Sequence, residues 1–397
     1  MLRELRARVD ALGTLPDSAS RQALELKELR ERIDTLAHKE LHHLRKHTTD
    51  LRRAVFSHTQ ITARALRQAG VLDEQAAHER ALQRVIDRAR RTGRPLLVGP
   101  WTGEVGFEVL YWIPFLRKLR SRLPDPPPFH VVSRGGAAPW YDGLATTYQD
   151  AFTLVTPAEF RAGTDRENRK QRALGAFDRR LIRAAGMTPG QTSGRTSPPT
   201  RPILVHPSLM YNLLYRYWKD QLPVRRLFDY LEPARLAAPS RDLLKGLELP
   251  ERYVAVRFYF SQAFPDSAGN RDLVRDIVGR LASRGPVVVL NPPIDVDDHR
   301  DAVAGDPRAI DVSRSLTPDN NLAVQSAIIA GAQRFVGTYG GFSYVAPLYG
   351  VPSVTFYSDR TFFEQHLEFA RRTFAAVGAA PFVVLHAAER ALLSDFA

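Results

Sequence analysis

The chain has 397 residues, with 56 Lys and Arg against 43 Asp and Glu, which gives a formal net charge of +13. Its hydrophobic content of 44% allows a sizeable core, and its length suggests two domains with an appendage. The absence of cysteine excludes disulfides, thiolate metal sites and cysteine nucleophiles, and no continuous apolar run is long enough to span a membrane. With a charged N-terminus, these features predict a cytoplasmic protein whose basic surface could touch the inner face of a membrane.

Residues 1–92 are predicted to form a helical extension. Its apolar positions recur at intervals of three and four, with one irregular step, at Leu26, Leu29, Ile33, Leu36, Leu41, Leu44, Thr48, Leu51 and Val55. This spacing predicts a coiled-coil helix over Leu26–Val55 with a buried apolar stripe. The stripe would pack on the main body or on a second copy of the chain. Nucleic-acid binding is not expected, because acidic residues are interspersed among the basic ones.

The rest of the chain alternates short apolar runs with helical patterns. The strands expected in residues 93–230 are Leu96–Gly99, His130–Ser133, Phe152–Val155 and Ile203–His206. Those expected in residues 231–397 are Tyr253–Arg257, Val287–Leu290, Ala309–Val312, Arg334–Gly337, Ser353–Tyr357 and Phe382–Leu385. Buried strands that alternate with helices indicate parallel sheets covered on both faces. We therefore expect an α/β fold of two Rossmann-like domains that face a cleft, joined by a helical link over Leu222–Pro250.

A glycine-rich stretch at residues 337–343 joins a predicted strand to a predicted helix. Such a turn lets a ligand approach the backbone closely, and it directs N–H groups and the helix dipole at an anion. The expected contacts to a bound nucleotide are Thr338, Gly340, Gly341, Phe342 and Ser343. An ordinary tight turn is the alternative.

The segment from Tyr253 to Tyr357 resembles the nucleotide-sugar-binding part of glycosyltransferases of the GT-B architecture. Heptosyltransferase-like enzymes show a similar glycine-containing turn, short Ala-rich helix and following strand. They often carry a His in that helix, where this chain has Tyr344 and Val345. The resemblance implies a nucleotide-sugar donor bound mainly in residues 231–397, inversion at the anomeric carbon, and no cofactor or metal besides that donor.

A predicted strand ends in Arg257, and fucosyltransferase-like enzymes resemble this chain there: their strand ends in an Arg that contacts the donor diphosphate. The planar fork of Arg matches phosphate oxygens. Lys219, in an aromatic and basic cluster, is a second candidate cation for the donor. The alternatives are that Arg257 pairs with a carboxylate such as Asp266, and that the Lys219 cluster is packing.

A second glycine-rich loop at residues 99–108 follows the first predicted strand and carries Glu104 and Glu108. In GT-B enzymes this loop commonly holds acceptor-side groups, including the base that removes the acceptor proton. The resemblance therefore implies Glu104 as general base, with Glu108 one turn further along, facing either the cleft or solvent. A helix-capping role is the alternative for Glu104. Arg134, after the second strand, could meet an anionic acceptor or the donor phosphates.

The run Asp295–His299 contains the Asp-x-Asp spacing that binds metal in other glycosyltransferases. It follows a loop, and no second metal-binding signal accompanies it. A solvated acidic loop is therefore expected here, and no metal site.

These observations predict a glycosyltransferase of polysaccharide biosynthesis that moves a sugar from a nucleotide-diphosphate donor to a glycan, lipid-linked or protein acceptor. Homo-oligomers would form through the N-terminal helix. One alternative is a non-catalytic coiled-coil adaptor whose α/β body binds a nucleotide or a polyanion. Another is transfer of a different group, such as pyruvyl, on a similar fold.

Overall fold

The computed structural model describes residues 19–68, 71–166, 171–185, 201–291, 300–302, 305–359 and 364–389. Contacts divide the chain into two units, Met1–Glu74 and Gln75–Ala397. In the first unit, the helix expected over Leu26–Val55 is confirmed as part of α2 (Ala19–Gln68). Its stripe is not buried within the single chain, since Leu41, Leu44 and Leu51 are 55%, 62% and 63% exposed. No helix in the described part of the chain is both long and apolar enough to cross a membrane.

Helix α3 (Val71–Thr92) anchors its C-terminal part in the core of the larger unit. Leu82, Ile86 and Ala89 recur at the helical spacing of four and three, and all three are buried. The helix leads directly into the first strand, so this stretch belongs to the body.

The first sheet of the larger unit has four parallel strands, in the order β3-β2-β1-β4. They are β1 (Leu96–Val98), β2 (Phe129–Ser133), β3 (Thr147–Asp150) and β4 (Ile203–Val205). The fully buried Leu96 of β1 aligns with Phe129 on one side and Ile203 on the other. Burial on both faces explains why the strands read as apolar runs.

Short helices surround this sheet and continue into the link. They are α4 (Val105–Phe107), the π-helix η1 (Glu108–Trp112), α5 (Ile113–Ser121), η2 (Ala138–Tyr141), η3 (Ala151–Thr153), α6 (Pro157–Arg166), α7 (Ala176–Ala184), α8 (Ser208–Leu214), η4 (Tyr217–Lys219), η5 (Val224–Asp229) and η6 (Arg241–Leu244). The expected helical link over Leu222–Pro250 is wrong as a continuous helix, because only the short 3-10 helices η5 and η6 form there. Pro233 and Pro239 lack the N–H that a continuous helix needs.

The second sheet has six parallel strands, in the order β12-β11-β10-β5-β7-β9. They are β5 (Val254–Arg257), β7 (Val287–Val289), β9 (Ile310–Asp311), β10 (Arg334–Thr338), β11 (Ser353–Tyr357) and β12 (Phe382–His386). A small antiparallel pair joins β6 (Tyr259–Phe260) to β8 (Arg300–Asp301). The other elements are α9 (Ala268–Arg284), η7 (Ser313–Ser315), α10 (Asn321–Gly331), α11 (Gly341–Leu348) and α12 (Glu364–Val377).

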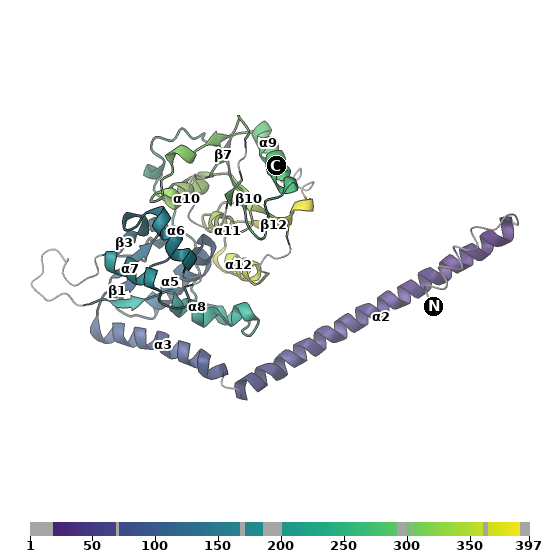
Figure 1. Cartoon of the computed structure of the whole chain (residues 1–397), viewed down its shortest axis with the longest axis horizontal. Coiled ribbons are helices and arrows are strands. Elements are labelled where there is room, and N and C mark those ends of the chain that lie inside the picture. The colour runs from purple at the N-terminus through teal and green to yellow at the C-terminus, as the bar shows by residue number, and fades with distance from the viewer. Residues whose placement is uncertain are drawn as a thin grey trace, which may run out of the picture. The chain divides into compact units, whose positions relative to one another are not determined.

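The strand orders confirm the expected fold class of two Rossmann-like parallel sheets with a helical extension. When the strands of each sheet are numbered along the chain, the second sheet has the order 6-5-4-1-2-3. Read from the opposite edge, this is the Rossmann order 3-2-1-4-5-6. The first sheet has the order 3-2-1-4, which is the first part of the same order. In Figure 1 the teal elements around β1 and β3 and the green to yellow elements around β10 and β12 form the two halves of the larger unit. The cleft and the domain limits at 92/93 and 230/231 stay predictions.

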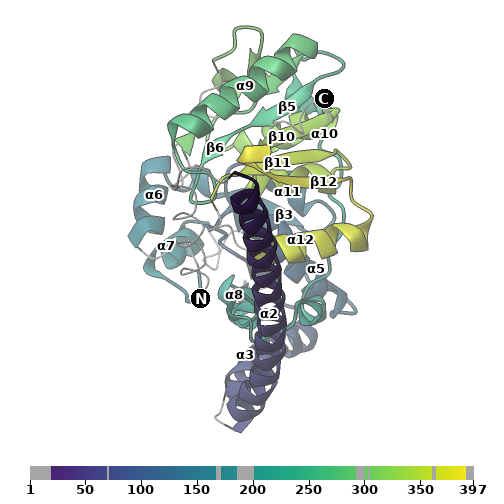
Figure 2. The same cartoon turned by 90° about the vertical axis from the view of Figure 1, so that its right-hand side faces the viewer.

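The two halves make direct contact at the ends of their strands. The N–H of Leu322 donates to the carbonyl of Gly135 over 2.6 Å, and Trp140 Nε1 donates to Ser326 Oγ over 2.9 Å. Helix α12 belongs to the second half, yet it lies beside the elements of the first (Figure 2). Its His366 Nδ1 lies 2.7 Å from the hydroxyl of Tyr111. We call this set of contacts the seam.

Candidate functional site

The second sheet has its topological switch point between β5 and β10. From β5 the chain proceeds to β7 and β9 on one side, then crosses to β10, β11 and β12 on the other. Ligands of open α/β sheets bind beyond the carboxyl ends of the strands at such a point. Arg257 is the last residue of β5, and it is aligned with Gly337 near the end of β10. The fold therefore brings together the two motifs that the sequence singled out separately.

Arg257 is held in place by three side chains, and its own side chain is only 12% exposed. Its Nη1 donates to Gln325 Oε1 over 2.8 Å, and its Nε lies 3.3 Å from Asp301 Oδ1. The guanidinium also lies over the ring of Phe342, 4.5 Å from the ring centre. The alternative that Arg257 pairs with a carboxylate is therefore confirmed, but its partner is Asp301; the expected partner Asp266 is wrong, since that carboxylate pairs with Arg271 and Arg300. Arg257 is thus a preorganised cation beside the start of α11.

The turn at residues 338–343 is shaped by its glycines. Gly340 has a φ of 137°, and a Cβ there would lie 2.2 Å from the hydroxyl of Tyr259. Only glycine is free of strain in this conformation. Ser343 is buried, and its hydroxyl accepts a hydrogen bond from the N–H of Gly340 over 3.0 Å, so it caps the turn. The N–H of Ser343 donates to the carbonyl of Gly340 over 2.8 Å, so the N–H groups of Gly341 and Phe342, at the start of α11, are the ones that suit an anion.

Thr338 is less available than expected. Its hydroxyl donates to the carbonyl of Tyr259 over 2.9 Å and accepts from the N–H of the same residue over 3.0 Å. A threonine hydroxyl has one hydrogen to donate. In this structure Thr338 therefore ties β10 to β6, and the turn offers backbone N–H groups in place of its hydroxyl.

The loop that carries Glu104 packs on this turn. Glu104 is half-buried and precedes α4, and its backbone is extended, with φ −73° and ψ 150°. A Cβ on Gly341 would lie 3.2 Å from Cβ of Val105, and one on Gly106 would lie 3.2 Å from the ring of Tyr344. The small residues on both sides bring α4 and α11 close together. The expected acceptor loop and the expected donor turn are therefore neighbours.

Glu108 faces neither a cleft nor solvent, contrary to expectation, because it is fully buried in the π-helix. Its Oε1 accepts hydrogen bonds from Ser133 Oγ at 2.5 Å and from the hydroxyl of Tyr141 at 2.6 Å, while its buried Oε2 has no partner. Desolvation raises the pKa of Glu108 from 4.5 to about 7, against the opposing effect of those two hydrogen bonds and of Arg134. No sequence signal distinguishes this buried carboxyl from an exposed one.

This raised pKa makes folding stability depend on pH. The folded state binds the proton more tightly than the unfolded state, so the stabilisation is fully present below pH 4.5 and is lost as pH rises through about 7. The shift corresponds to roughly 3 kcal/mol. Glu108→Gln should flatten the pH dependence of the free energy of unfolding between pH 5 and 8, as measured by urea denaturation. If the free energy of unfolding depends on pH equally in both proteins, Glu108 is not the group with the raised pKa.

Arg134 and Lys219 contact other residues than the group around Arg257. Arg134 is buried, and its Nε and Nη2 donate to the carbonyl of Gly103 over 3.1 and 2.8 Å, so it braces the Glu104 loop from inside. Lys219 is exposed in η4, with its Nζ 5.5 Å from the ring centre of Tyr215. The structure does not bring Lys219 into contact with the donor turn.

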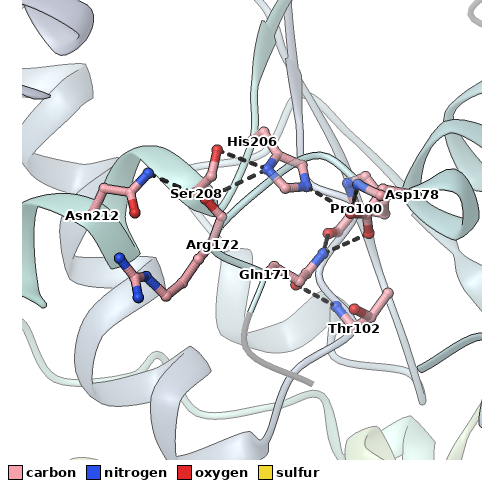
Figure 3. A network of polar contacts seen from close by, with 9 residues as sticks. Pro100, Thr102, Gln171, Arg172, Asp178, His206, Ser208 and Asn212 are labelled. Atoms are coloured by element: carbon pink, nitrogen blue, oxygen red, sulfur yellow. Dashed lines mark hydrogen bonds and ion pairs between the residues drawn. The ribbon is translucent and has the colours of Figure 1, made fainter. Parts of the chain in front are cut away.

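A buried polar network that sequence reasoning missed lies at the carboxyl end of β4 (Figure 3). His206 Nε2 lies 3.1 Å from Asp178 Oδ2, and its Nδ1 lies 2.9 Å from Ser208 Oγ. Because the N–H of Ser208 also points at Nδ1, at 3.2 Å, we assign the ring proton to Nε2, which donates to Asp178. The only local signal is His-Pro-Ser directly after a strand, since Asp178 lies far away in the sequence.

Gln171 ties this network to the first glycine-rich loop. Its amide nitrogen donates to Asp178 Oδ1 and to the carbonyl of Pro100, both over 2.8 Å, and its amide oxygen accepts from the N–H of Thr102 over 3.0 Å. Burial would raise the pKa of Asp178, but hydrogen bonds from His206, Gly175 and Gln171 bring it below its usual value. The network therefore fixes the loop before Glu104.

The run Asp295–His299 lies outside the described residues. Among the residues that are described, no group of three or more His, Asp or Glu side chains is placed to hold a metal ion.

Comparisons with known proteins give similarity only at the level of solved structures. No family model matches the chain, and no curated protein does. A glycosyl transferase family 9 protein from Veillonella parvula is 14% identical, with a TM-score of 0.41 over 76% of this chain and 88% of that one. The ADP-heptose lipopolysaccharide heptosyltransferase II of E. coli is 12% identical, with a TM-score of 0.39 over 71% and 99%. A UDP-GlcNAc 2-epimerase from Methanocaldococcus jannaschii is 10% identical, with a TM-score of 0.36 over 76% and 91%. Function therefore has to be argued from the site.

Proposed function

We propose that the chain is a glycosyltransferase that moves a sugar from a nucleotide-diphosphate donor to a glycan, lipid-linked or protein acceptor. The observation that carries the proposal is the position of Arg257 and the start of α11 on either side of the switch point between β5 and β10. A fixed guanidinium and a helix N-terminus beside a glycine turn suit a diphosphate.

The donor side would act through charge. As the bond to the sugar breaks, negative charge develops on the leaving diphosphate. The guanidinium of Arg257 and the free N–H groups of α11 are already oriented, so they stabilise this charge without reorganisation. Phe342 holds the guanidinium from one side, and Gln325 and Asp301 take two of its five N–H groups. The remaining N–H groups would bind the diphosphate.

The acceptor side would use Glu104 as the general base. Its carboxylate takes the proton of the acceptor hydroxyl as the oxygen attacks the anomeric carbon, and the configuration inverts. The contact of Val105 with Gly341 supports this role, because it places the residue after Glu104 against the donor turn. Glu108, fully buried, instead supports the helix that follows.

A thermal-shift screen of the full chain tests the proposal. Nucleoside diphosphates and nucleotide-diphosphate sugars should raise the unfolding temperature, since a ligand at 100 times its Kd stabilises the native state by about 2.7 kcal/mol. Nucleoside monophosphates and free sugars are the controls. The absence of any shift with all nucleotide-diphosphate sugars would overturn the proposal. The adaptor alternative predicts a shift without turnover.

We also propose that α2 pairs with α2 of a second copy. Three leucines at coiled-coil spacing, Leu41, Leu44 and Leu51, are more than half exposed in the single chain, and burying them would stabilise a helical pair. Leu44→Glu with Leu51→Glu should therefore lower the mass measured by light scattering to that of one chain. The control Arg45→Glu with Arg52→Glu introduces the same residues beside the stripe. An unchanged mass in the leucine variant would exclude pairing through this face.

A further inference from the structure

One face of α8 carries three half-exposed side chains whose roles are unassigned. Ser208, Asn212 and Tyr215 are spaced by four and three residues and therefore lie on the same side of the helix. Tyr211, three residues after Ser208 and four before Tyr215, borders this face on its buried side, and its ring stacks on Trp101 with the ring centres 5.9 Å apart. Trp101 belongs to the loop that leads to Glu104, so this face of α8 lies next to the proposed acceptor loop.

Two exposed cations share the ring of Tyr215. The guanidinium carbon of Arg172 lies 3.7 Å from the ring centre, and Nζ of Lys219 lies 5.5 Å from it. A guanidinium stacked on a ring keeps its N–H donors free at its edges, where they match the paired oxygens of a carboxylate or phosphate. In the described part of the chain, no carboxylate lies within ion-pair distance of either cation. An anion at this ring would be attracted by both charges.

The buried network fixes the other end of this face. Asp178 holds His206 with its unprotonated Nδ1 toward Ser208, so the hydroxyl of Ser208 donates to that nitrogen. The oxygen lone pairs of Ser208 then remain available to accept hydrogen bonds. Asn212 Nδ2 donates to the carbonyl of Arg172 over 3.2 Å, which fixes the backbone that presents the guanidinium (Figure 3).

We propose that this face, formed by Ser208, Asn212, Tyr215, Arg172 and Lys219, binds an acceptor carbohydrate that bears a carboxylate or a phosphate. The proposal rests on the proposed function, since it names the class of acceptor for the same reaction. At one end of this face the hydroxyl of Ser208 can accept hydrogen bonds from sugar hydroxyls. At the other end Arg172 and Lys219 match a single anionic group on the same sugar. The donor diphosphate already has Arg257 in the other half.

Isothermal titration of the full chain tests this with four probes. They are a glucuronic acid-containing tetrasaccharide, glucose 6-phosphate, neutral maltotetraose and inorganic phosphate. At least one of the first two should bind more tightly than the last two, and which one binds separates a carboxylate from a phosphate ligand. Arg172→Ala with Lys219→Ala should weaken that binding roughly tenfold or more. Ser208→Ala should weaken it less. The matched control Arg284→Ala with Arg314→Ala removes the same charge from exposed positions of the other half.

Binding of a nucleotide-diphosphate sugar is measured on the same proteins. Loss of carbohydrate binding in the Arg172 and Lys219 variant, with donor binding intact, supports the proposal. Equal carbohydrate affinity in that variant and in the control overturns it, as does inorganic phosphate binding as tightly as the charged sugars. If the unaltered chain does not bind a nucleotide-diphosphate sugar, the proposed glycosyltransferase function fails. The carbohydrate titrations still show whether this face binds a charged sugar.

Discussion

Replacing Glu104 by glutamine is expected to lower the turnover number by about 10²- to 10⁴-fold, the usual contribution of a general base. The amide is close in size to the carboxylate and keeps the start of α4, but it does not accept the acceptor proton. Affinity for the donor should stay unchanged, because the diphosphate would be held by Arg257 and the turn at residues 338–343. Product formation at saturating donor and acceptor measures the effect.

Glu108→Gln is the matched control for that experiment. It makes the same chemical change one helical turn further on, at a side chain that is fully buried and bonded to Ser133 and Tyr141. It should alter stability more than turnover. If the Glu104 variant turns over normally and the Glu108 variant is inactive, the base has been assigned one turn too early. Normal turnover in both would place the base elsewhere.

Arg257→Ala should weaken binding of a nucleotide-diphosphate sugar by about 10- to 100-fold. Charge-assisted hydrogen bonds contribute roughly 1.5–3 kcal/mol each, and the guanidinium here is held in place by Gln325, Asp301 and Phe342 before any ligand arrives. Ser343→Ala should have a smaller effect, because the backbone N–H groups of α11 remain. Calorimetric affinity is the measurement.

Two controls separate phosphate binding from folding. Arg300→Ala removes an exposed arginine that pairs with Asp266 in the same half, and it should leave donor affinity unchanged. Arg257→Lys keeps the charge and loses the fork, so its affinity should lie between those of the unaltered chain and the alanine variant. Unchanged affinity in Arg257→Ala would exclude this residue as a diphosphate ligand.

The sheets could be predicted from the sequence because their strands are buried on both faces and stand out as short apolar runs. The prediction failed where a side chain redirected the backbone. The run Phe152–Val155 is apolar but is not a strand, since β3 ends at Asp150 and a 3-10 turn follows. Asp150 accepts a hydrogen bond from the N–H of Phe152 over 2.9 Å, and this cap turns the chain.

The candidate site was predictable only in its local parts. Arg257 and the turn at 338–343 each follow a recognisable strand, so each could be identified alone. Their alignment across β5 and β10 depends on strand order, which no local pattern encodes. The pairing of His206 with Asp178 is equally non-local, because the two residues belong to different elements that only the fold brings together. The burial of Glu108 depends on Ser133 and Tyr141, which approach it from other parts of the chain.

The N–H of Leu322 donates across the seam to the carbonyl of Gly135. The hydrogen-exchange rate of this amide therefore reports separation of the two halves. Leu322 is the second residue of α10, so its amide has no acceptor within the helix. Its hydrogen-bond acceptor in this structure is the carbonyl of Gly135, in the other half. Amides in the middle of α10 exchange when the helix unfolds, whereas this one exchanges whenever the halves part. The ratio of the two exchange rates therefore measures the free energy of opening separately from that of unfolding, with and without a bound nucleotide.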